Sequence, residues 1–472
     1  MLRRKNMIYI RTYAYNAEKT IAKAIESVIT QTKKEFCYYL MDNGSTDSTG
    51  EIIRRYAERD NRIVPFYNKV NFAYEEHPEF WDIASTLEDT DYYVTLDADD
   101  YYEPTFLEEI LGFMNSESLD VAACGSDFFD AETGTVLAQR VLSQSLVCKD
   151  RVSYDKFFRY IHWNLRQVWG KVYSGKVAKR ILGFHKPQWW PRAYGGDTAN
   201  VLVCLKYADS IGVYGKVLHH YRMSVKSISH KWLEGREKCD VILHEKTCAF
   251  ILSKAGYLSD DNLKFLCGVY LYAVKDTLDV LSQAEMHVSK KLELMNVIFS
   301  EQITLLALKM DLSSVKDGEY LQELINDYKR KYLEWTLSVA RLITQEDMPV
   351  IENFLKSFNP AFESFFTTGQ MYEMLYSAPE VIADLSYENY VNALEKVKLL
   401  LCDGPNTKRY LIQLAQNLAA LISKEEEYVI YSKMYIHNLI LCGEKEMAQA
   451  EIDEWLQVLP NDEEFLKLKV LI

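Results

Sequence analysis

Three aspartates follow directly on a short apolar segment in the sequence VTLDADDYYEP, at residues 94–104. They are Asp97, Asp99 and Asp100. Carboxylates that gather at the end of a buried strand repel one another and lose hydration, unless a cation or hydrogen-bond donors compensate. A Mg²⁺ or Mn²⁺ ion bound by one or two carboxylates, with water and phosphate oxygens as its other ligands, meets that need. The alternative is a solvated turn that caps a helix beginning near Pro104.

A fourth aspartate, Asp197, stands at the start of a helical pattern in the sequence YGGDTANVLVCL. The two glycines before it let a ligand approach closely, and the helix dipole would keep the carboxylate ionised. Asp197 is therefore a candidate general base, which takes a proton from a reacting hydroxyl group. The alternative is an ordinary helix N-cap, a common use of aspartate.

The elements that must position these acids alternate along the first half of the chain. Residues 7–15, 35–44 and 91–100 have the apolar patterns of strands, and helical patterns lie between them. The first helical pattern places five apolar residues on one face: Ile21, Ala24, Ile25, Val28 and Ile29. Such alternation predicts a Rossmann-like, mixed and mostly parallel sheet, with ligands at the carboxyl ends of its strands.

From about Leu233 the chain changes to helical periodicity without strand signals. A chain of 472 residues also exceeds what one hydrophobic core usually holds. We therefore predict an α/β domain at residues 1–232 and an all-α domain at residues 233–472. The last segment resembles a tetratricopeptide repeat, with a helix, a turn at Gly443 and a second helix that contains Ala448 and Ala450.

The composition excludes several classes of protein. The formal net charge of −14 argues against broad binding to nucleic acid or anionic membranes. The nine cysteines are scattered without a Cys-x-x-Cys pair, so neither a disulfide framework nor a zinc site is indicated. The start of the sequence lacks the features of a secretory signal, and no run of about 18 apolar residues predicts a membrane span. We expect a cytoplasmic protein, and peripheral association with the inner face of the membrane stays open.

Three segments, in order, resemble glycosyltransferase family 2, whose members are inverting nucleotide-sugar transferases with the GT-A fold. RTYAYNAEKTIAKAIESVITQT is similar to the opening segment of that family, and LMDNGSTDST is similar to its second-strand signature. LDADDYYEPTFLEEIL resembles its Asp-x-Asp segment. The similarity continues more weakly to about residue 232, through VWGKVYSGKVAKR, YGGDTANVLVCL and HHYRMSVKSISH.

This resemblance implies metal-dependent transfer of a hexosyl or N-acetylhexosaminyl group from a nucleotide-diphosphate donor, with UDP-sugar favoured, to a hydroxyl of a glycan or protein. A capsule or cell-wall glycan is the commonest acceptor in the family. Asp97 and Asp99 would bind Mn²⁺ or Mg²⁺, and Asp197 would be the catalytic base. The predicted nucleotide-sugar contacts are Tyr13, Tyr15, Asn16, Asp42, Asn43, Asp97, Ala98 and Arg222. The predicted acceptor-side aromatics are Trp169, Trp189 and Trp190.

Several positions depart from the family pattern. Asn43 stands where many relatives carry an aspartate that accepts the imide proton of uracil, so the preferred nucleobase is open. Gly196 replaces the usual acid before the base. Ser224 occupies a place where relatives often have a histidine near the diphosphate, which leaves His219 and His220 as fallback metal ligands.

Two other functions compete with this interpretation. A nucleotidyltransferase-like enzyme would need a Gly-rich loop with Arg and Lys after the first strand, but YAYNAEK stands there. A degenerate transferase that serves as an interaction scaffold would not need to retain Asp97, Asp99 and Asp197. In the transferase interpretation, residues 233–472 would recruit an acceptor or partner, mediate self-association, or support the sheet.

Overall fold

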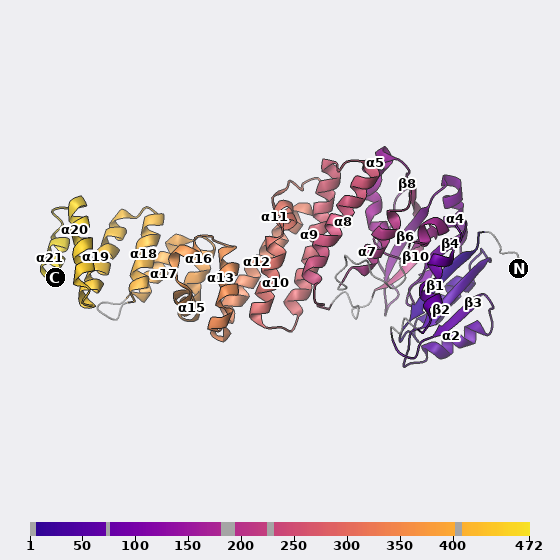
Figure 1. Cartoon of the computed structure of the whole chain (residues 1–472), viewed down its shortest axis with the longest axis horizontal. Coiled ribbons are helices and arrows are strands. Elements are labelled where there is room, and N and C mark those ends of the chain that lie inside the picture. Colours follow the sequence, from indigo (N-terminus) through magenta and orange to yellow (C-terminus); the bar gives the residue numbers. More distant parts are fainter. Residues whose placement is uncertain (1–5, 72–75, 181–193, 224–230, 402–407) are drawn as a thin grey trace. The chain divides into compact units, whose positions relative to one another are not determined.

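The computed structural model describes residues 6–71, 76–180, 194–223, 231–401 and 408–472. They form two compact units. The first unit comprises residues 1–284 and 301–322, and the second comprises residues 285–300 and 323–472. Figure 1 shows that the strands belong to the first part of the chain and that helices make up the rest. The predicted α/β region followed by an all-helical region is thus confirmed.

The first unit is built on a mixed sheet with the strand order β3-β2-β1-β4-β9-β6-β10-β5. Its first strands are parallel to one another, and β1 lies between β2 and β4. Their bounds are β1 (Ile8–Ala14), β2 (Phe36–Asp42), β3 (Ile63–Tyr67) and β4 (Tyr92–Thr95). The carboxyl ends of β2, β1 and β4 therefore reach the same edge of the sheet.

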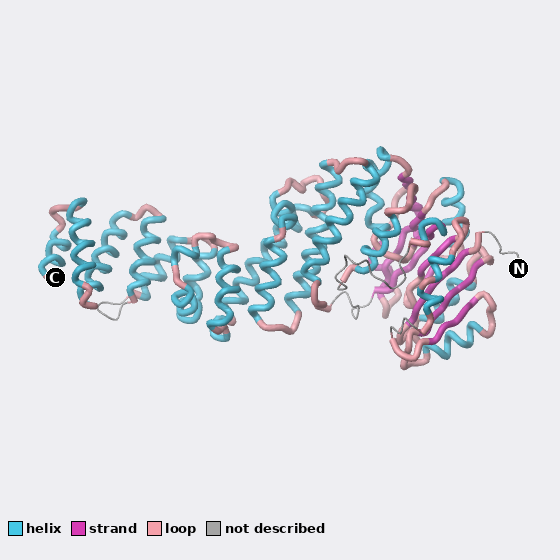
Figure 2. The backbone as a smooth tube through the Cα atoms, viewed as in Figure 1, coloured by secondary structure: helices cyan, strands magenta, loops and turns pink. Residues whose placement is uncertain are grey.

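The other half of the sheet mixes both strand directions. Figure 2 shows the strands of the sheet in magenta. Strand β10 runs parallel to β6, whereas β9 is antiparallel to both of its neighbours, β4 and β6. At one end β5 is antiparallel to β10, and β7 and β8 add antiparallel pairs to β6 and β10. The bounds are β5 (Tyr101–Tyr102), β6 (Val121–Asp130), β7 (Val136–Arg140), β8 (Leu146–Cys148), β9 (Lys171–Ser174) and β10 (Ile211–Met223).

Two apolar clusters hold helices against the sheet, as expected for layered α/β packing. In the first cluster, α1 (Ile21–Ile29) buries Ile21, Ala24, Ile25 and Val28, so the predicted apolar face is buried apart from its half-buried last member. Helix α4 (Phe106–Glu117) joins the same cluster, and α2 (Thr49–Ala57) adds Ile53. The second cluster contains α5 (Arg151–Leu165) and α7 (Gly196–Leu205). Short helices complete this region: α3 (Pro78–Trp81), η1 (Ile83–Thr86) and α6 (Gly175–Ala178).

Helices after residue 233 also belong to the core of the first unit. They are α8 (Arg236–Ala255), α9 (Asp260–Gln283) and α11 (Gln302–Lys309). Phe250 and Ile251 of α8 are buried in the same cluster as Phe158 of α5. The change to helices near Leu233 therefore does not coincide with the edge of the first unit. The functional division at residue 232 stays a prediction.

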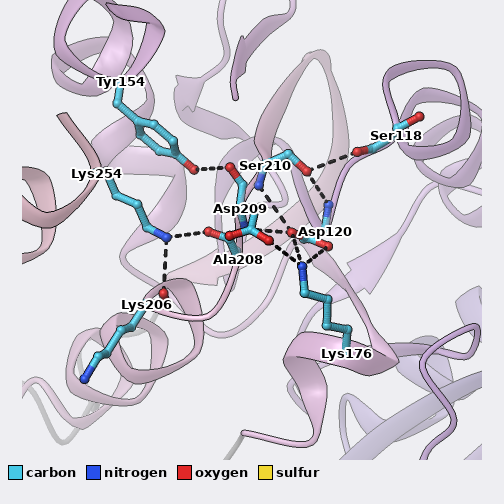
Figure 3. A network of polar contacts seen from close by, with 9 residues as sticks. All are labelled: Ser118, Asp120, Tyr154, Lys176, Lys206, Ala208, Asp209, Ser210 and Lys254. Carbon is cyan, nitrogen blue, oxygen red and sulfur yellow. Dashed lines mark hydrogen bonds and ion pairs between the residues drawn. The ribbon is translucent and has the colours of Figure 1, made fainter. Parts of the chain in front are cut away.

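A polar network ties α8 to the end of α7 (Figure 3). The Lys254 ammonium of α8 donates to the carbonyl oxygens of Lys206, at 3.1 Å, and Ala208, at 2.5 Å. These carbonyls lie at the C-terminal end of α7, where a cation is favourable. In the same network, Lys176 of α6 pairs with Asp120 at 3.2 Å. Helix α7, whose first turn carries Asp197, is thus fixed at its far end.

The second unit consists of helices in its described residues, and sequential helices pack against each other. The helices are α10 (Val288–Ser300), the larger part of α12 (Gly318–Ser338), η3 (Ala340–Leu342), η4 (Gln345–Asp347), α13 (Met348–Lys356), α14 (Phe362–Phe365), α15 (Thr368–Ser377), α16 (Pro379–Ser386), α17 (Tyr390–Leu400), α18 (Arg409–Leu421), α19 (Glu425–Leu441), α20 (Lys445–Val458) and α21 (Glu463–Val470). Gly443 has a φ of +81° between α19 and α20, as a tight helical turn requires. Ala448 and Ile452 then pack against Phe465. Among the helices described here, none is both long enough and apolar enough to cross a membrane.

Candidate active site

The predicted acid cluster lies in the turn between β4 and β5, at the carboxyl end of a central strand. The turn is closed by a hydrogen bond from the Asp100 amide to the Asp97 carbonyl oxygen, at 3.2 Å. Asp99 is exposed, Asp97 is half-buried and Asp100 is buried. The three neighbouring carboxyls therefore have very different access to a ligand.

Asp100 is used inside the protein. Its Oδ1 accepts a hydrogen bond from the Arg222 amide of β10, at 2.9 Å. Its Oδ2 lies 3.2 Å from Nε2 of His219, although the two atoms are not aligned as a hydrogen bond. Asp100 thus connects the turn after β4 to strand β10. Asp97 and Asp99 remain the candidates for a ligand.

Asp197 is exposed and is the second residue of α7, after Gly195 with a φ of +76°. Burial, followed by the repulsion of Asp100, Asp197 and Asp99, raises the pKa of Asp97 well above its ordinary value. This repulsion means that Asp197, 100 residues further along the chain, lies near the acid turn. Burial and the same four carboxyls also raise the pKa of Tyr221. We call Asp97, Asp99, Asp100 and Asp197 the carboxylate cluster.

The carboxylate cluster fits a divalent cation by the chemistry of its donors. Among the residues that the structure describes, no three His, Cys, Asp or Glu side chains form a ready-made metal site. Two carboxylates are nevertheless enough for Mg²⁺ or Mn²⁺ when phosphate and water supply the other ligands. A cation beside Asp97 would also favour the ionised form that its neighbours now disfavour.

The two fallback histidines have other partners. Nδ1 of His219 lies 3.2 Å from Oγ of Ser126. The His220 ring lies between two carboxylates, with Nδ1 2.6 Å from Asp127 and Nε2 2.8 Å from Glu103. Both rings are therefore engaged within the fold, and a metal-binding role for them gains no support.

Asn16 and Asn43 organise the loops after β1 and β2. Asn16 has a φ of +49°, and its side-chain oxygen accepts a hydrogen bond from the Thr46 amide at 2.8 Å. The Asn43 side chain is 1% exposed; it donates to Asn71 and accepts from Asn68, both at 2.8 Å. The side-chain amide of Asn43 thus forms hydrogen bonds with residues of a neighbouring loop. A direct contact of Asn43 with a nucleobase stays a prediction.

The other predicted donor contacts lie at the same sheet edge. Asp42 ends β2, and its Oδ1 accepts from the Ser45 amide at 3.0 Å. A Cβ at Gly50 would stand 2.4 Å from Asp42 Oδ2, so a larger residue there would displace this carboxylate. Tyr13 at the end of β1 is half-buried, with its ring centroid 5.8 Å from that of Trp81, whereas Tyr15 is 46% exposed. Ala98 lies half-buried within the acid turn.

Arg222 lies near the end of β10, beside the acid turn. One of its guanidinium nitrogens donates to the Ala131 carbonyl oxygen at 3.3 Å. Desolvation raises the pKa of Asp99 even though this side chain reaches the surface, and the charge of Arg222 partly offsets that rise. The structure therefore places a cation near the metal-binding candidate, where the diphosphate of a donor would need it.

The predicted acceptor-side tryptophans differ in what the structure describes. Trp169 is 6% exposed and stacks on His219, with ring centroids 4.4 Å apart and ring planes at 15°. It also contacts the Tyr221 ring, at 5.1 Å. Trp169 thus packs against β10 beside the carboxylate cluster, and its contact with an acceptor stays a prediction. Trp189 and Trp190 lie outside the described residues.

Lys171 is a buried cation that the sequence reasoning did not single out. It begins β9, and its ammonium donates to the carbonyl oxygens of Gln167 and, at 3.3 Å, Trp169. Burial lowers the pKa of Lys171 to about 7, and the negative charge of Asp197 is among the weaker opposing causes. No local signal in the sequence marks it, because its burial depends on the pairing of β9 with β4 and β6.

Comparisons with known proteins assign part of the chain to a family. Residues 10–180 match the model of the family described as glycosyl transferase family 2. Glycosyltransferase GlyA of Streptococcus pneumoniae serotype 4 is 24% identical over 229 residues, which cover 47% of this chain and 31% of GlyA. The uncharacterized glycosyltransferase YibD of Escherichia coli is 29% identical over 134 residues, which cover 28% of this chain and 38% of YibD. The chain thus spans less than two fifths of the length of either relative.

Solved structures of other proteins align with more than half of the chain at low sequence identity. The structure of S. aureus TarS 1–349 covers 69% of this chain and 91% of its own, with 14% identity and a TM-score of 0.40. The mannosyltransferase PcManGT from Pyrobaculum calidifontis, in complex with GDP-Man and Mn²⁺, covers 70% of this chain and 88% of its own, with 13% identity and a TM-score of 0.37. The family match at the motifs that suggested it confirms the resemblance: residues 10–180 form a glycosyl transferase family 2 domain.

Proposed function

We propose that this chain is an inverting, metal-dependent transferase that moves a hexosyl or N-acetylhexosaminyl group from a nucleotide-diphosphate donor. The favoured donor is a UDP-sugar, and the acceptor is a hydroxyl of a glycan or protein. The observation that carries this proposal is that the charges of both Asp99 and Asp197, the latter from a separate segment of the chain, raise the pKa of Asp97. Asp97 and Asp99 are suited to bind a metal ion, and Asp197 is suited to act as the general base.

The roles follow from position and charge. Asp97 and Asp99 would hold Mn²⁺ or Mg²⁺, which when bound neutralises charge that develops on the departing diphosphate. Arg222 contributes a fixed positive charge to the same leaving group. Asp197 takes the proton of the acceptor hydroxyl, and its place at the start of α7 favours its ionised form. A single displacement of this kind inverts the configuration at the anomeric carbon.

The division of labour is part of the same proposal. Residues 1–232 carry the donor chemistry, and residues 233–472 recruit the acceptor or a partner, or mediate self-association. The described cysteines are free, which agrees with the cytoplasm as the proposed location. A capsule or cell-wall glycan is the proposed acceptor class.

The test is hydrolysis of a panel of UDP-, GDP- and dTDP-sugars by the purified full chain, with Mn²⁺, with Mg²⁺ or with EDTA. We expect slow, metal-dependent release of one nucleoside diphosphate, and loss of that release in Asp97→Asn. The matched control is Asp82→Asn, which changes an exposed aspartate outside the carboxylate cluster. Release that proceeds equally in EDTA would contradict the proposal.

A further inference from the structure

The second unit contains an open pocket of about 280 Å³ that no role described above explains. It lies between helix α12, the segment after α13 and the end of α16. This volume is close to the lower end of the range of about 300–1,000 Å³ for small-molecule sites. The pocket therefore has room for a ligand the size of a sugar ring.

One wall of the pocket carries hydrogen-bonding side chains from helix α12. Asn326, Lys329 and Arg330 have the i, i+3, i+4 spacing that places side chains on one face of a helix, here α12. The Lys329 ammonium donates to the Ser357 carbonyl oxygen and lies 4.6 Å from the centre of the Phe358 ring. This lysine is thus anchored at two points rather than free in solvent.

The facing wall is aromatic and acidic. Tyr387 follows α16 and is 43% exposed, with its ring centroid 6.2 Å from that of Phe358 and the two planes at 82°. The next residue, Glu388, also lines the pocket and has a φ of +55°. An exposed aromatic ring therefore stands beside both donors and acceptors of hydrogen bonds.

The positive and negative charges of the side chains around the pocket are equal in number. Lys329 and Arg330 are positive, Glu388 is negative, and Arg330 forms an ion pair with Asp327. With its positive charge compensated in this way, the pocket does not favour phosphate or another anion. A neutral, polyhydroxylated ring suits it better, because hydroxyl groups bond to amide, guanidinium and carboxylate groups while the C–H face of the ring packs on an aromatic ring.

We propose that this pocket binds a neutral sugar unit of the acceptor glycan. The proposal rests on the proposed transferase function and gives the helical half a specific task in it. A sugar held in the second unit would increase the local concentration of acceptor chain without any part in donor chemistry. Tyr387 supplies the stacking surface, and Asn326 supplies an amide that reads a hydroxyl.

The experiment is saturation-transfer difference NMR on the full chain with glucose, galactose and N-acetylglucosamine, each alone and with inorganic phosphate added as an anionic competitor. Saturating UDP and diamagnetic Mg²⁺ are present to fill the proposed donor site. We expect at least one sugar to bind and Tyr387→Ala to weaken it roughly 2- to 12-fold, as loss of an aromatic contact does. The matched control is Tyr376→Ala, which removes a tyrosine that is 56% exposed on α15 and does not line the pocket.

The second variant is Asn326→Ala, which changes an exposed helix position and keeps the test valid if Tyr387→Ala fails to fold. Binding of no sugar, equal binding by both pocket variants and wild type, or competition by phosphate would each overturn the proposal. Metal-dependent donor hydrolysis, measured on the same samples, is expected to be unchanged in both pocket variants. Absence of hydrolysis in the wild type would contradict the transferase function instead, so the two failures are distinguishable.

Discussion

Nε2 of His219 lies 3.2 Å from Oδ2 of Asp100, and neither side chain is more than 1% exposed. Because the other carboxyl oxygen accepts the Arg222 amide, Asp100 is a joint between the acid turn and strand β10 rather than a free ligand. The third acid of the motif therefore holds its two neighbours in place.

Replacement of His219 tests this joint. We expect His219→Ala to lower the free energy of unfolding by about 2–5 kcal/mol, because removal of the buried ring leaves a cavity beside Trp169 and Asp100. We also expect it to weaken Mn²⁺ binding. Urea denaturation and Mn²⁺ titration followed by EPR measure the two effects. The control His437→Ala removes an exposed histidine in α19. Unchanged stability and unchanged Mn²⁺ affinity would show that the contact has no such role.

Asp99 is the exposed acid of the turn, so its removal should affect ligands more than folding. We expect Asp99→Ala to abolish Mn²⁺-dependent binding of UDP, because one of two protein ligands to the metal is lost. Isothermal titration with and without EDTA measures this binding, and the melting temperature reports the fold. If wild-type chain binds UDP equally well in EDTA and in Mn²⁺, the metal assignment is wrong.

Asp197 is the proposed base. Asp197→Asn keeps the size of the side chain but removes its proton-accepting charge. We expect turnover to fall roughly 10²–10⁴-fold, the usual worth of general-base catalysis. Donor affinity should change little, because the diphosphate contacts remain. A variant with most of its turnover would assign the proton transfer to water or to another group.

Lys171 predicts a pH dependence of stability. Burial lowers the pKa of Lys171 to about 7, whereas an unfolded lysine titrates near about 10.4. Between these values the unfolded state binds more protons than the native state, so this group makes the free energy of unfolding rise with pH. Relative to Lys171→Met, the wild type should gain on the order of 3 kcal/mol between about pH 7 and pH 9.5.

Urea denaturation of both chains across that pH range measures the effect. The control is Lys19→Met, at an exposed position of the loop before α1. Parallel stability curves for wild type and Lys171→Met would show that Lys171 titrates normally in the native state.

Truncation separates the roles of the helices. Removal of residues 233–472 would expose Phe158 and its neighbours, because Phe250 and Ile251 of α8 belong to their cluster. We expect this fragment to be insoluble, whereas a chain that ends at Ala284, where the continuous part of the first unit ends, keeps α8 and α9 and should be more soluble and hydrolyse donor. Size-exclusion chromatography and the hydrolysis assay compare the two. A soluble, active fragment of residues 1–232 would contradict the contribution of α8.

Local patterns predicted the elements whose contacts are close in sequence. The apolar spacing of α1 gave its buried face, and the acids after β4 marked the edge where ligands are expected. Strand β9 could not be found in this way, because its four residues pair with β4 and β6 only through distant registers such as Tyr93 with Tyr173.

The same reason explains which contacts of the site the sequence did not predict. The contact of His219 with Asp100 depends on the pairing of β10 with β5, in which His219 stands opposite Tyr102. The burial of Lys171 depends on β9 being a central strand, and the burial of Trp169 depends on its stacking against β10. Motif order predicted roles for Asp97, Asp99 and Asp197, whereas the pairing of distant strands determines which side chains surround Asp97 and Asp99.

The place of β9 has a consequence for how the chain matures on the ribosome. Strand β4 is complete at residue 95, yet its neighbour β9 is made only at residues 171–174, and β10 ends at residue 223. During synthesis, the edge of β4 that pairs with β9 therefore stays unpaired until more than seventy further residues have been made. Such long-range pairing is slow and leaves strand edges exposed to other chains. We expect nascent chains shorter than about 223 residues to depend on chaperones that cover apolar strands.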